Sequence, residues 1–194
     1  MNRIIKKVAV LGSGVMGSRI ACHFANIGCS AYLLDIAPNK LTEDETKKGL
    51  TLESPEVRNR IVNTNLQNVL KQKPESLYDE SYSSRITTGN FEDNLNWLSE
   101  CDWIIEAVIE NLEIKKSVFE KVEKFRKEGT LITSNTSGIP IQSMLEGRSE
   151  DFKQHFCGVH FFNPPRYLPL MEIIPTNKTK KKITRLLVKS WSFY

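Results

Sequence analysis

Long hydrophobic runs are missing from this sequence of 194 residues, and so are the cysteine patterns of metal sites and disulfide frameworks. No apolar stretch approaches the roughly 18–20 residues that cross a bilayer, so we expect no membrane insertion. The first residues, 1–7, contain no long apolar core of a signal peptide, and the expected location is cytoplasmic. The four cysteines form no CxxC pair and lie mainly in apolar segments, where a free thiol acts as a small hydrophobe. Neither a disulfide framework, a bound metal nor a nucleophilic triad is therefore predicted.

The net charge of +4 is weak evidence for a nucleic-acid partner, because the basic excess lies in one short segment. Residues 178–194 contain lysines and an arginine but no acid, and acids outnumber bases in the rest of the chain. Such a cluster can bind an anionic membrane or a nucleic-acid backbone, but it is more often the solvated face of a helix. We therefore predict a solvated basic tail and no nucleic-acid partner.

Three spaced glycines, Gly12, Gly14 and Gly17, follow an apolar run and precede apolar residues at helical spacing. This order predicts a buried strand, a tight turn and a helix. Gly12 and Gly14 lack a Cβ atom, so the turn can close and its backbone can approach a pyrophosphate, while Gly17 lets the helix pack closely on the sheet. The phosphates would bind the free N–H groups that open the helix, where Val15 and Met16 lie.

A second strand, predicted at residues 31–35, ends on Asp35, about twenty residues after Gly14. A carboxylate there can accept hydrogen bonds from the ribose hydroxyls of adenosine and would repel a 2′-phosphate. Ile36 and Ala37 supply no arginine for such a phosphate. NAD is therefore favoured over NADP, and an ordinary turn without a ligand is disfavoured because strand, glycines and acid coincide.

A polar, helix-rich stretch follows, which we expect to form a helical arm at about residues 41–75. Thr42–Glu45 has the spacing of a capping box. Ser54–Glu56 supplies an N-cap serine, a proline at the first helical position and an acid in the first turn, so two helices are predicted. The arm carries a group of bases: Arg58, Arg60, Lys71 and Lys73. A solvated arm and an arm that meets a phosphate-rich substrate handle both remain open, and the charge pattern alone favours the solvated arm.

Regular alternation then resumes. Strands are predicted at 86–88, 102–108, 130–134, 156–161 and 171–174, with a short helical crossover at 91–98 and an amphipathic helix at 113–126. The predicted fold is α/β, a Rossmann-type doubly wound and mainly parallel sheet with a helical insertion after its second strand. Ligands bind at the carboxyl ends of such strands, where the polar segment 135–138 should lie.

His160 and Glu172 form a second candidate site, because each lies in an apolar segment that reads as a strand. A buried acid needs a partner, and a carboxylate that orients an imidazole raises its basicity, so that the ring can take a proton from an alcohol. Ser137 and Asn163 could hold the alcohol oxygen or the nicotinamide amide. A core histidine bonded to backbone is an equally good interpretation of His160 from the residues alone.

Four motifs together resemble one family. In chain order they are Leu11–Gly17, Glu106–Leu112, Ser134–Ser137 and His160–Pro164. In this order and spacing they are similar to the NAD-binding domain of 3-hydroxyacyl-CoA dehydrogenases, over roughly residues 4–177. The segments Asn163–Leu168 and Lys71–Pro74 look closer to the large bacterial enzymes that also carry an enoyl-CoA hydratase domain.

The resemblance implies oxidation of an (S)-3-hydroxyacyl-CoA to the 3-ketoacyl-CoA in fatty acid β-oxidation. It makes His160 the general base, Glu172 its partner and Ser137 a neighbour of the substrate hydroxyl. It adds cofactor-lining residues to the glycines and Asp35, namely Ala107, Glu110, Lys115 and Asn163. It also favours the interpretation in which the arm helps to hold coenzyme A, although Gly138 stands where many members have a second serine.

The end of the chain departs from the family pattern. Family members continue with a helical domain of about a hundred residues, which completes the cleft and usually forms the homodimer. Here the pattern is lost from Lys178 onward, so we expect a truncated copy without that domain, and we hypothesise that residues 178–194 are out of frame. A non-catalytic dinucleotide-binding module is the alternative function, whereas a dehydrogenase of small hydroxy acids is disfavoured by the motif at 160–164.

Overall fold

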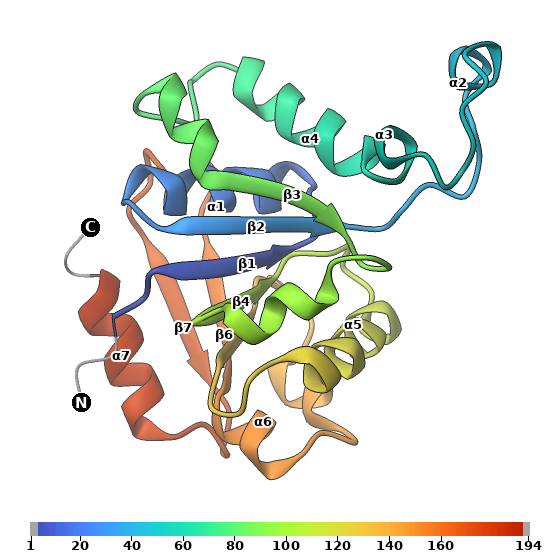
Figure 1. Cartoon of the computed structure of the whole chain (residues 1–194). Helices are drawn as coiled ribbons and strands as arrows, with labels where there is room; N and C mark the ends of the chain where they lie inside the picture. Colours follow the sequence, from blue (N-terminus) through green and yellow to red (C-terminus); the bar gives the residue numbers. More distant parts are fainter. Residues whose placement is uncertain (1–3, 192–194) are drawn as a thin grey trace.

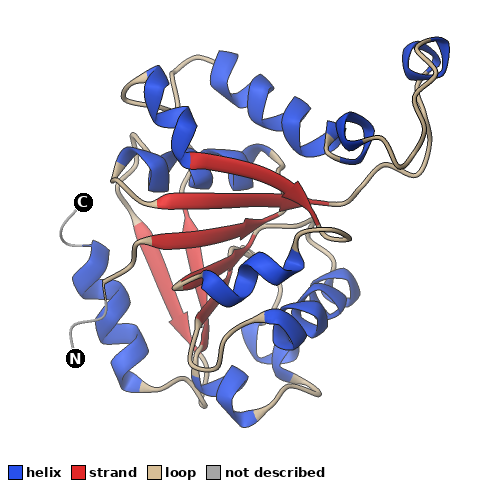
Figure 2. Ribbon diagram, viewed as in Figure 1, coloured by secondary structure: helices blue, strands red, loops and turns tan. Residues whose placement is uncertain are grey.

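A computed structural model describes residues 4–191, which fold around one seven-stranded sheet. Its strands are β1 (Lys7–Leu11), β2 (Ser30–Asp35), β3 (Ile86–Asn90), β4 (Trp103–Glu106), β5 (Leu131–Ser134), β6 (Phe156–Phe161) and β7 (Met171–Pro175). They lie in the order β3-β2-β1-β4-β5-β6-β7. All neighbouring pairs are parallel except β6 and β7, which run antiparallel. The predicted Rossmann-type sheet is confirmed (Figures 1 and 2).

The order of the strands reverses beside β1, which pairs with β2 on one side and with β4 on the other. In open α/β sheets, ligands bind outside the carboxyl ends of the strands at such a switch point. The glycine turn after Leu11 and the loop after Glu106 therefore meet at the edge where a dinucleotide is expected.

Helices cover both faces of the sheet (Figure 2). The helices are α1 (Val15–Asn26), α2 (Glu43–Lys47), α3 (Pro55–Arg58), α4 (Arg60–Lys71), α5 (Leu112–Phe125), α6 (Glu150–Gln154) and α7 (Lys181–Trp191), with 3₁₀ turns η1 (Glu80–Arg85), η2 (Leu95–Glu100) and η3 (Ile141–Leu145). One apolar core joins the sheet to α1, α4 and α7, and the other joins it to η2, α5, η3 and α6. All four cysteines are buried and free, as predicted.

The helical arm inserts between β2 and β3, and α2 lies at its far tip (Figure 1). The predicted capping box of α2 is present, since the Thr42 side chain accepts from the Glu45 N–H and the Glu45 side chain accepts from the Thr42 N–H. The second predicted helix is divided in two at Asn59. Val62, Leu66 and Val69 of α4 are buried in the core that contains α1, which fixes the base of the arm.

Residues 181–191 form α7, whose lysines are exposed while Ile183 and Leu187 are 3% and 1% exposed within the core. The basic surface of the tail is thus a solvated helix face. The hypothesis that residues 178–194 are out of frame stays a prediction, and residues 192–194 lie outside the described residues. Among the helices within 4–191, none has both the length and the apolar character that crossing a membrane requires.

Candidate active site

Two glycines at the turn between β1 and α1 leave no room for a side chain. Gly12 has φ +100°, a conformation that favours glycine, and a Cβ atom there would lie 2.6 Å from the Ala107 carbonyl oxygen. A Cβ atom on Gly17 would lie 1.8 Å from the Gly12 carbonyl oxygen. These two glycines therefore hold the turn against the loop after β4 and against α1.

Gly14, by contrast, faces open space. No atom lies within 4 Å of the position that a Cβ on Gly14 would take. Gly14 is the N-cap of α1, no side chain caps this helix, and its first turn contains no acid. The first N–H groups of the helix, at Val15 and its neighbours, are thus open to an anion, as the binding of a pyrophosphate requires.

Asp35, at the end of β2, is bonded to the same turn. Its Oδ2 accepts from the Ser13 N–H at 2.6 Å and from the Ser13 hydroxyl at 2.5 Å, and its Oδ1 accepts from the Ile36 N–H at 2.7 Å. The Ser13 hydroxyl also accepts from Nδ2 of Asn65 in the arm, at 2.9 Å. A carboxylate offers about four acceptor sites, so Asp35 keeps capacity for a ribose hydroxyl.

A cleft of about 420 Å³ opens beside this turn, at the carboxyl ends of β4, β5 and β6. Six of the predicted site residues line it, namely Met16, Ala107, Glu110, Ser137, His160 and Asn163, together with Val108, Asn135, Phe161 and Phe162. Four motifs that are distant in the sequence therefore share one cavity. Ser137 and Asn163 are exposed at it, and the Asn135 Oδ1 accepts from the Phe161 N–H at 2.9 Å, which joins the loops after β5 and β6.

His160 and Glu172 are cross-strand partners in the antiparallel pair of β6 and β7. The His160 Nδ1 lies 2.9 Å from the Glu172 Oε2, and the two side chains are 23% and 54% exposed. An ionised carboxylate can only accept, so Nδ1 carries the hydrogen and Nε2 keeps a lone pair for an incoming proton. His160 Nδ1 therefore has a carboxylate as its partner, where a core histidine would bond backbone.

A buried ion pair, which the sequence interpretation did not anticipate, supports the floor of the cleft. Glu106 ends β4 at 0% exposure, and its Oε1 lies 2.7 Å from the Lys115 Nζ. Glu106 also accepts from the Ser134 hydroxyl and, at 2.7 Å, from the Val108 N–H. The predicted cofactor-lining residue Lys115 is 1% exposed and contacts Glu106 and Glu110. The only signal in the sequence is an acid that ends an apolar strand, with a lysine in the next helix.

Glu110 is held at the cleft as an anion. It accepts from the Thr136 hydroxyl and from the Gly138 N–H, and its Oε2 lies 3.3 Å from the Lys115 Nζ. Partial burial opposes ionisation, but these contacts outweigh it and lower the pKa of Glu110 to about 2. Glu110 therefore offers a permanent hydrogen-bond acceptor to a ligand in the cleft.

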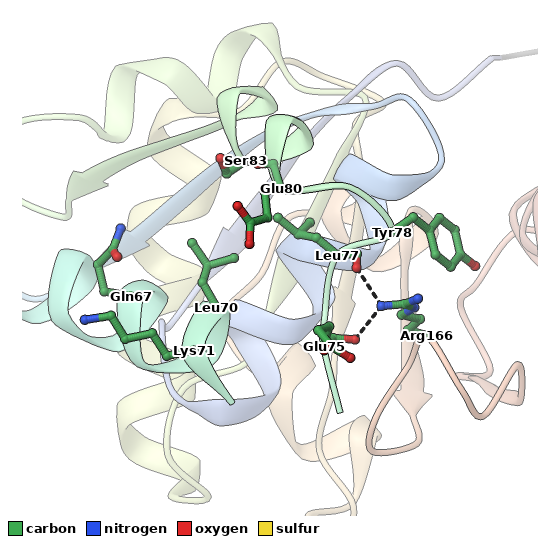
Figure 3. A pocket seen from close by; sticks show the side chains of 9 residues that line it. All are labelled: Gln67, Leu70, Lys71, Glu75, Leu77, Tyr78, Glu80, Ser83 and Arg166. Carbon is green, nitrogen blue, oxygen red and sulfur yellow. Dashed lines mark hydrogen bonds between the residues drawn. The ribbon is translucent and has the colours of Figure 1, made fainter. Parts of the chain in front are cut away.

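A second cavity, of about 580 Å³, lies between α4, η1 and the loop after β6 (Figure 3). Arg166 crosses from that loop and donates to the Glu75 and Leu77 carbonyl oxygens at 2.7 and 2.5 Å. Most of the predicted basic group of the arm is already paired: Arg58 with Asp93, Arg60 with Glu45, and Lys73 with Glu75. Lys71, which lines this cavity, makes no ion pair within the described chain.

The residues present fit a dinucleotide. An open helix N-terminus, a glycine turn that needs its bare Cα atoms, and a carboxylate at the end of β2 supply the three contacts that the phosphates and the adenosine ribose require. Together with the paired histidine beside them, these features define a dinucleotide-binding domain of a dehydrogenase.

The family model for the NAD binding domain of 3-hydroxyacyl-CoA dehydrogenase matches residues 7–192, so the chain belongs to this family and carries an NAD-binding domain. A Bacillus subtilis protein, described as a probable 3-hydroxyacyl-CoA dehydrogenase, is 56% identical over 187 residues. The human mitochondrial hydroxyacyl-coenzyme A dehydrogenase is 32% identical over 185 residues. The alignments cover 96% and 95% of this chain, but only 24% and 55% of those two proteins.

Solved structures agree with the family assignment. The crystal structure of 3-hydroxybutyryl-CoA dehydrogenase from Escherichia coli superposes with a TM-score of 0.69 at 27% identity. The superposition covers 98% of this chain and 37% of that structure. The chain thus corresponds to one part of longer relatives.

Proposed function

We propose that this chain takes part in the NAD-dependent oxidation of (S)-3-hydroxyacyl-CoA to 3-ketoacyl-CoA, with His160 as the general base. The 2.9 Å contact between His160 and Glu172 carries the proposal, because it places an oriented imidazole on the cleft that adjoins the glycine turn. The names of the relatives support the substrate class, and fatty acid β-oxidation is the process that consumes such a substrate.

The proposed oxidation removes a proton from the 3-hydroxyl and a hydride from C3. His160 takes the proton of the 3-hydroxyl at Nε2, and Glu172 stabilises the imidazolium that forms. A bound NAD would supply the acceptor for the hydride of the substrate C3, so that loss of the proton and the hydride gives the ketone. Ser137 is exposed on the same cleft and is proposed to bond the substrate oxygen while the proton leaves.

The arm is proposed to hold the coenzyme A part of the substrate. Arg58, Arg60 and Lys73 already form ion pairs, so within this group of four bases Lys71 is the one proposed to meet a phosphate. Lys71 and Arg166 both line this cavity (Figure 3).

The test is the reverse reaction of the purified chain, followed as loss of NADH absorbance with acetoacetyl-CoA. We expect turnover in the natural sequence and a decrease of about 10²–10⁴-fold in His160→Gln, which removes the base but keeps a neutral polar side chain. NADH binding should be nearly unchanged in that variant. Turnover that survives His160→Gln would reject the base.

An Asp35→Ala variant tests the dinucleotide site independently of turnover. It should weaken NADH binding whether or not the chain turns over, because Asp35 belongs to the dinucleotide site alone. A folded chain that binds NADH but reduces no acetoacetyl-CoA would support the binding module.

A further inference from the structure

Arg19, in the second turn of α1, contacts two segments that the site depends on. Its Nη1 donates to the Asn163 Oδ1 at 2.5 Å, in the loop after β6. Its Nη2 donates to the Gln72 Oε1 at 3.0 Å, at the C-cap of α4 in the arm. One guanidinium therefore joins the dinucleotide-binding helix, the cleft and the base of the arm.

The partners of Arg19 are neutral. No carboxylate lies within ion-pair distance of its guanidinium in the described part of the chain, and its Nε is shielded from solvent. A guanidinium held by two amide oxygens keeps its full charge and acts only as a donor. Arg19 therefore orients the amides of its two partners and neutralises no charge on them.

The hydrogen bond from Arg19 fixes the orientation of the Asn163 amide. An amide can present either its oxygen or its NH₂ group to a neighbour, but only the oxygen can accept from a guanidinium. With Oδ1 bonded to Arg19, the Nδ2 group is the part of Asn163 left for the cleft, and no other residue within 4–191 accepts from it. Asn163 therefore meets a ligand as a donor.

We infer that Arg19 is a positioning residue, which holds Asn163 as a hydrogen-bond donor toward the nicotinamide half of the cofactor and couples that contact to the arm through Gln72. The inference rests on the proposed function, because it assumes that the cleft with His160 receives the reacting half of NAD. The pyrophosphate site lies at Gly14, and the cleft is the cavity that adjoins it, so the half beyond the phosphates has this cleft available. The carboxamide oxygen of the nicotinamide can accept from Nδ2 there.

The experiment compares two ligands that share the adenosine, the pyrophosphate and the second ribose, and differ in the nicotinamide. The affinities of NADH and of ADP-ribose, which lacks the nicotinamide, are measured by calorimetry on the natural chain, Arg19→Met and Arg19→Lys. Arg19→Met should weaken NADH about tenfold, the equivalent of one hydrogen bond, and change ADP-ribose less than twofold. Arg19→Lys, which keeps a donor for Oδ1, should recover part of the NADH affinity.

Arg85→Met is the matched control. Arg85 is also half-buried, and it donates to a neutral oxygen of the same helix, the Ala25 carbonyl, at 2.6 Å. It lies at the other end of α1 from the glycine turn, so its loss should change neither affinity. A parallel loss for both ligands in Arg19→Met would mean a general effect on the fold and would overturn the positioning role.

Asn163→Asp tests the donor directly. The carboxylate would still accept from Arg19, but it offers no N–H group to the cleft. We expect NADH to weaken at least as much as in Arg19→Met, and unchanged NADH affinity would overturn the inference. If the natural chain binds NADH and ADP-ribose equally well, the inference fails while dinucleotide binding stands; if it binds neither, the proposed function fails as well.

Discussion

His23 is a buried titratable residue of α1 that lies away from the cleft lining. Its side chain is 6% exposed, and burial lowers its pKa to about 4 from an ordinary value of 6.5. In the unfolded chain the imidazole therefore binds a proton at a higher pH than in the folded chain. Above about pH 6.5 the imidazole is neutral in both states. As the pH falls from 6.5 toward 4, the unfolded chain is protonated first, and the free energy of unfolding decreases.

His23→Gln should remove this pH dependence. Glutamine stays neutral in both states, so the stability difference between natural chain and variant should shift by up to about 3 kcal/mol between pH 7.5 and pH 4. Urea unfolding of both proteins at several pH values in that window measures the shift. Because both proteins share every other titratable group, parallel curves would contradict the assignment.

At the residue scale, the candidate-site residues that could be predicted from the sequence are those that belong to a local motif. The three glycines and Asp35 could be placed from the chain alone, since a strand, a turn and a second strand follow one another directly. The partner of His160 does not follow from a local pattern, because it depends on the register of β6 and β7, which puts Glu172 opposite His160. The pair of Glu106 with Lys115 and the bridge from Arg19 to Asn163 depend on tertiary contacts, which no local pattern encodes.

At the scale of one element, two glycines of the turn before α1 allow a prediction. Gly17→Ala would place a methyl group on the Gly12 carbonyl, and it should cost about 3 kcal/mol or more of stability. Gly14→Ala meets open space at φ −53°, so its stability should hardly change. Its methyl would nevertheless occupy the approach to the helix N-terminus, and NADH should bind at least tenfold more weakly.

Thermal unfolding and NADH titration of both variants measure this contrast. A Gly14→Ala protein that binds NADH normally would show that the pyrophosphate does not approach this turn. A stable Gly17→Ala protein would show that the close contact of α1 with the turn can relax.

Among the elements, the strands could be predicted from apolar runs, and the helices of the arm only in part. The capping box at Thr42 formed as expected because both of its partners lie within one turn. Ser54 instead accepts from the Thr51 N–H and makes no cap to α3. The predicted helical crossover after β3 is the 3₁₀ turn η2. Packing against the core, which is not a local property, decided these details.

At the scale of the whole molecule, α7 covers part of one face of the sheet and packs Leu187 into the core there. Leu187→Ala should lower the free energy of unfolding by about 2–4 kcal/mol, because it leaves a cavity at a side chain that is 1% exposed. Val188→Ala is the matched control, since Val188 is 57% exposed, and it should change stability by less than about 0.5 kcal/mol. Equal effects would mean that α7 does not pack as described.

The register of β6 and β7 limits which changes in the loop between them preserve the contact of His160 with Glu172. Side chains alternate between the two faces of a strand, so a shift of β7 by one residue would carry Glu172 to the face opposite His160. Insertions or deletions in residues 162–170 that moved the register by an odd number of positions would disconnect acid from base. Substitutions that keep the loop length would leave the pair intact. The contact of His160 with Glu172 is thus kept only when the alignment of the two strands shifts by an even number of residues.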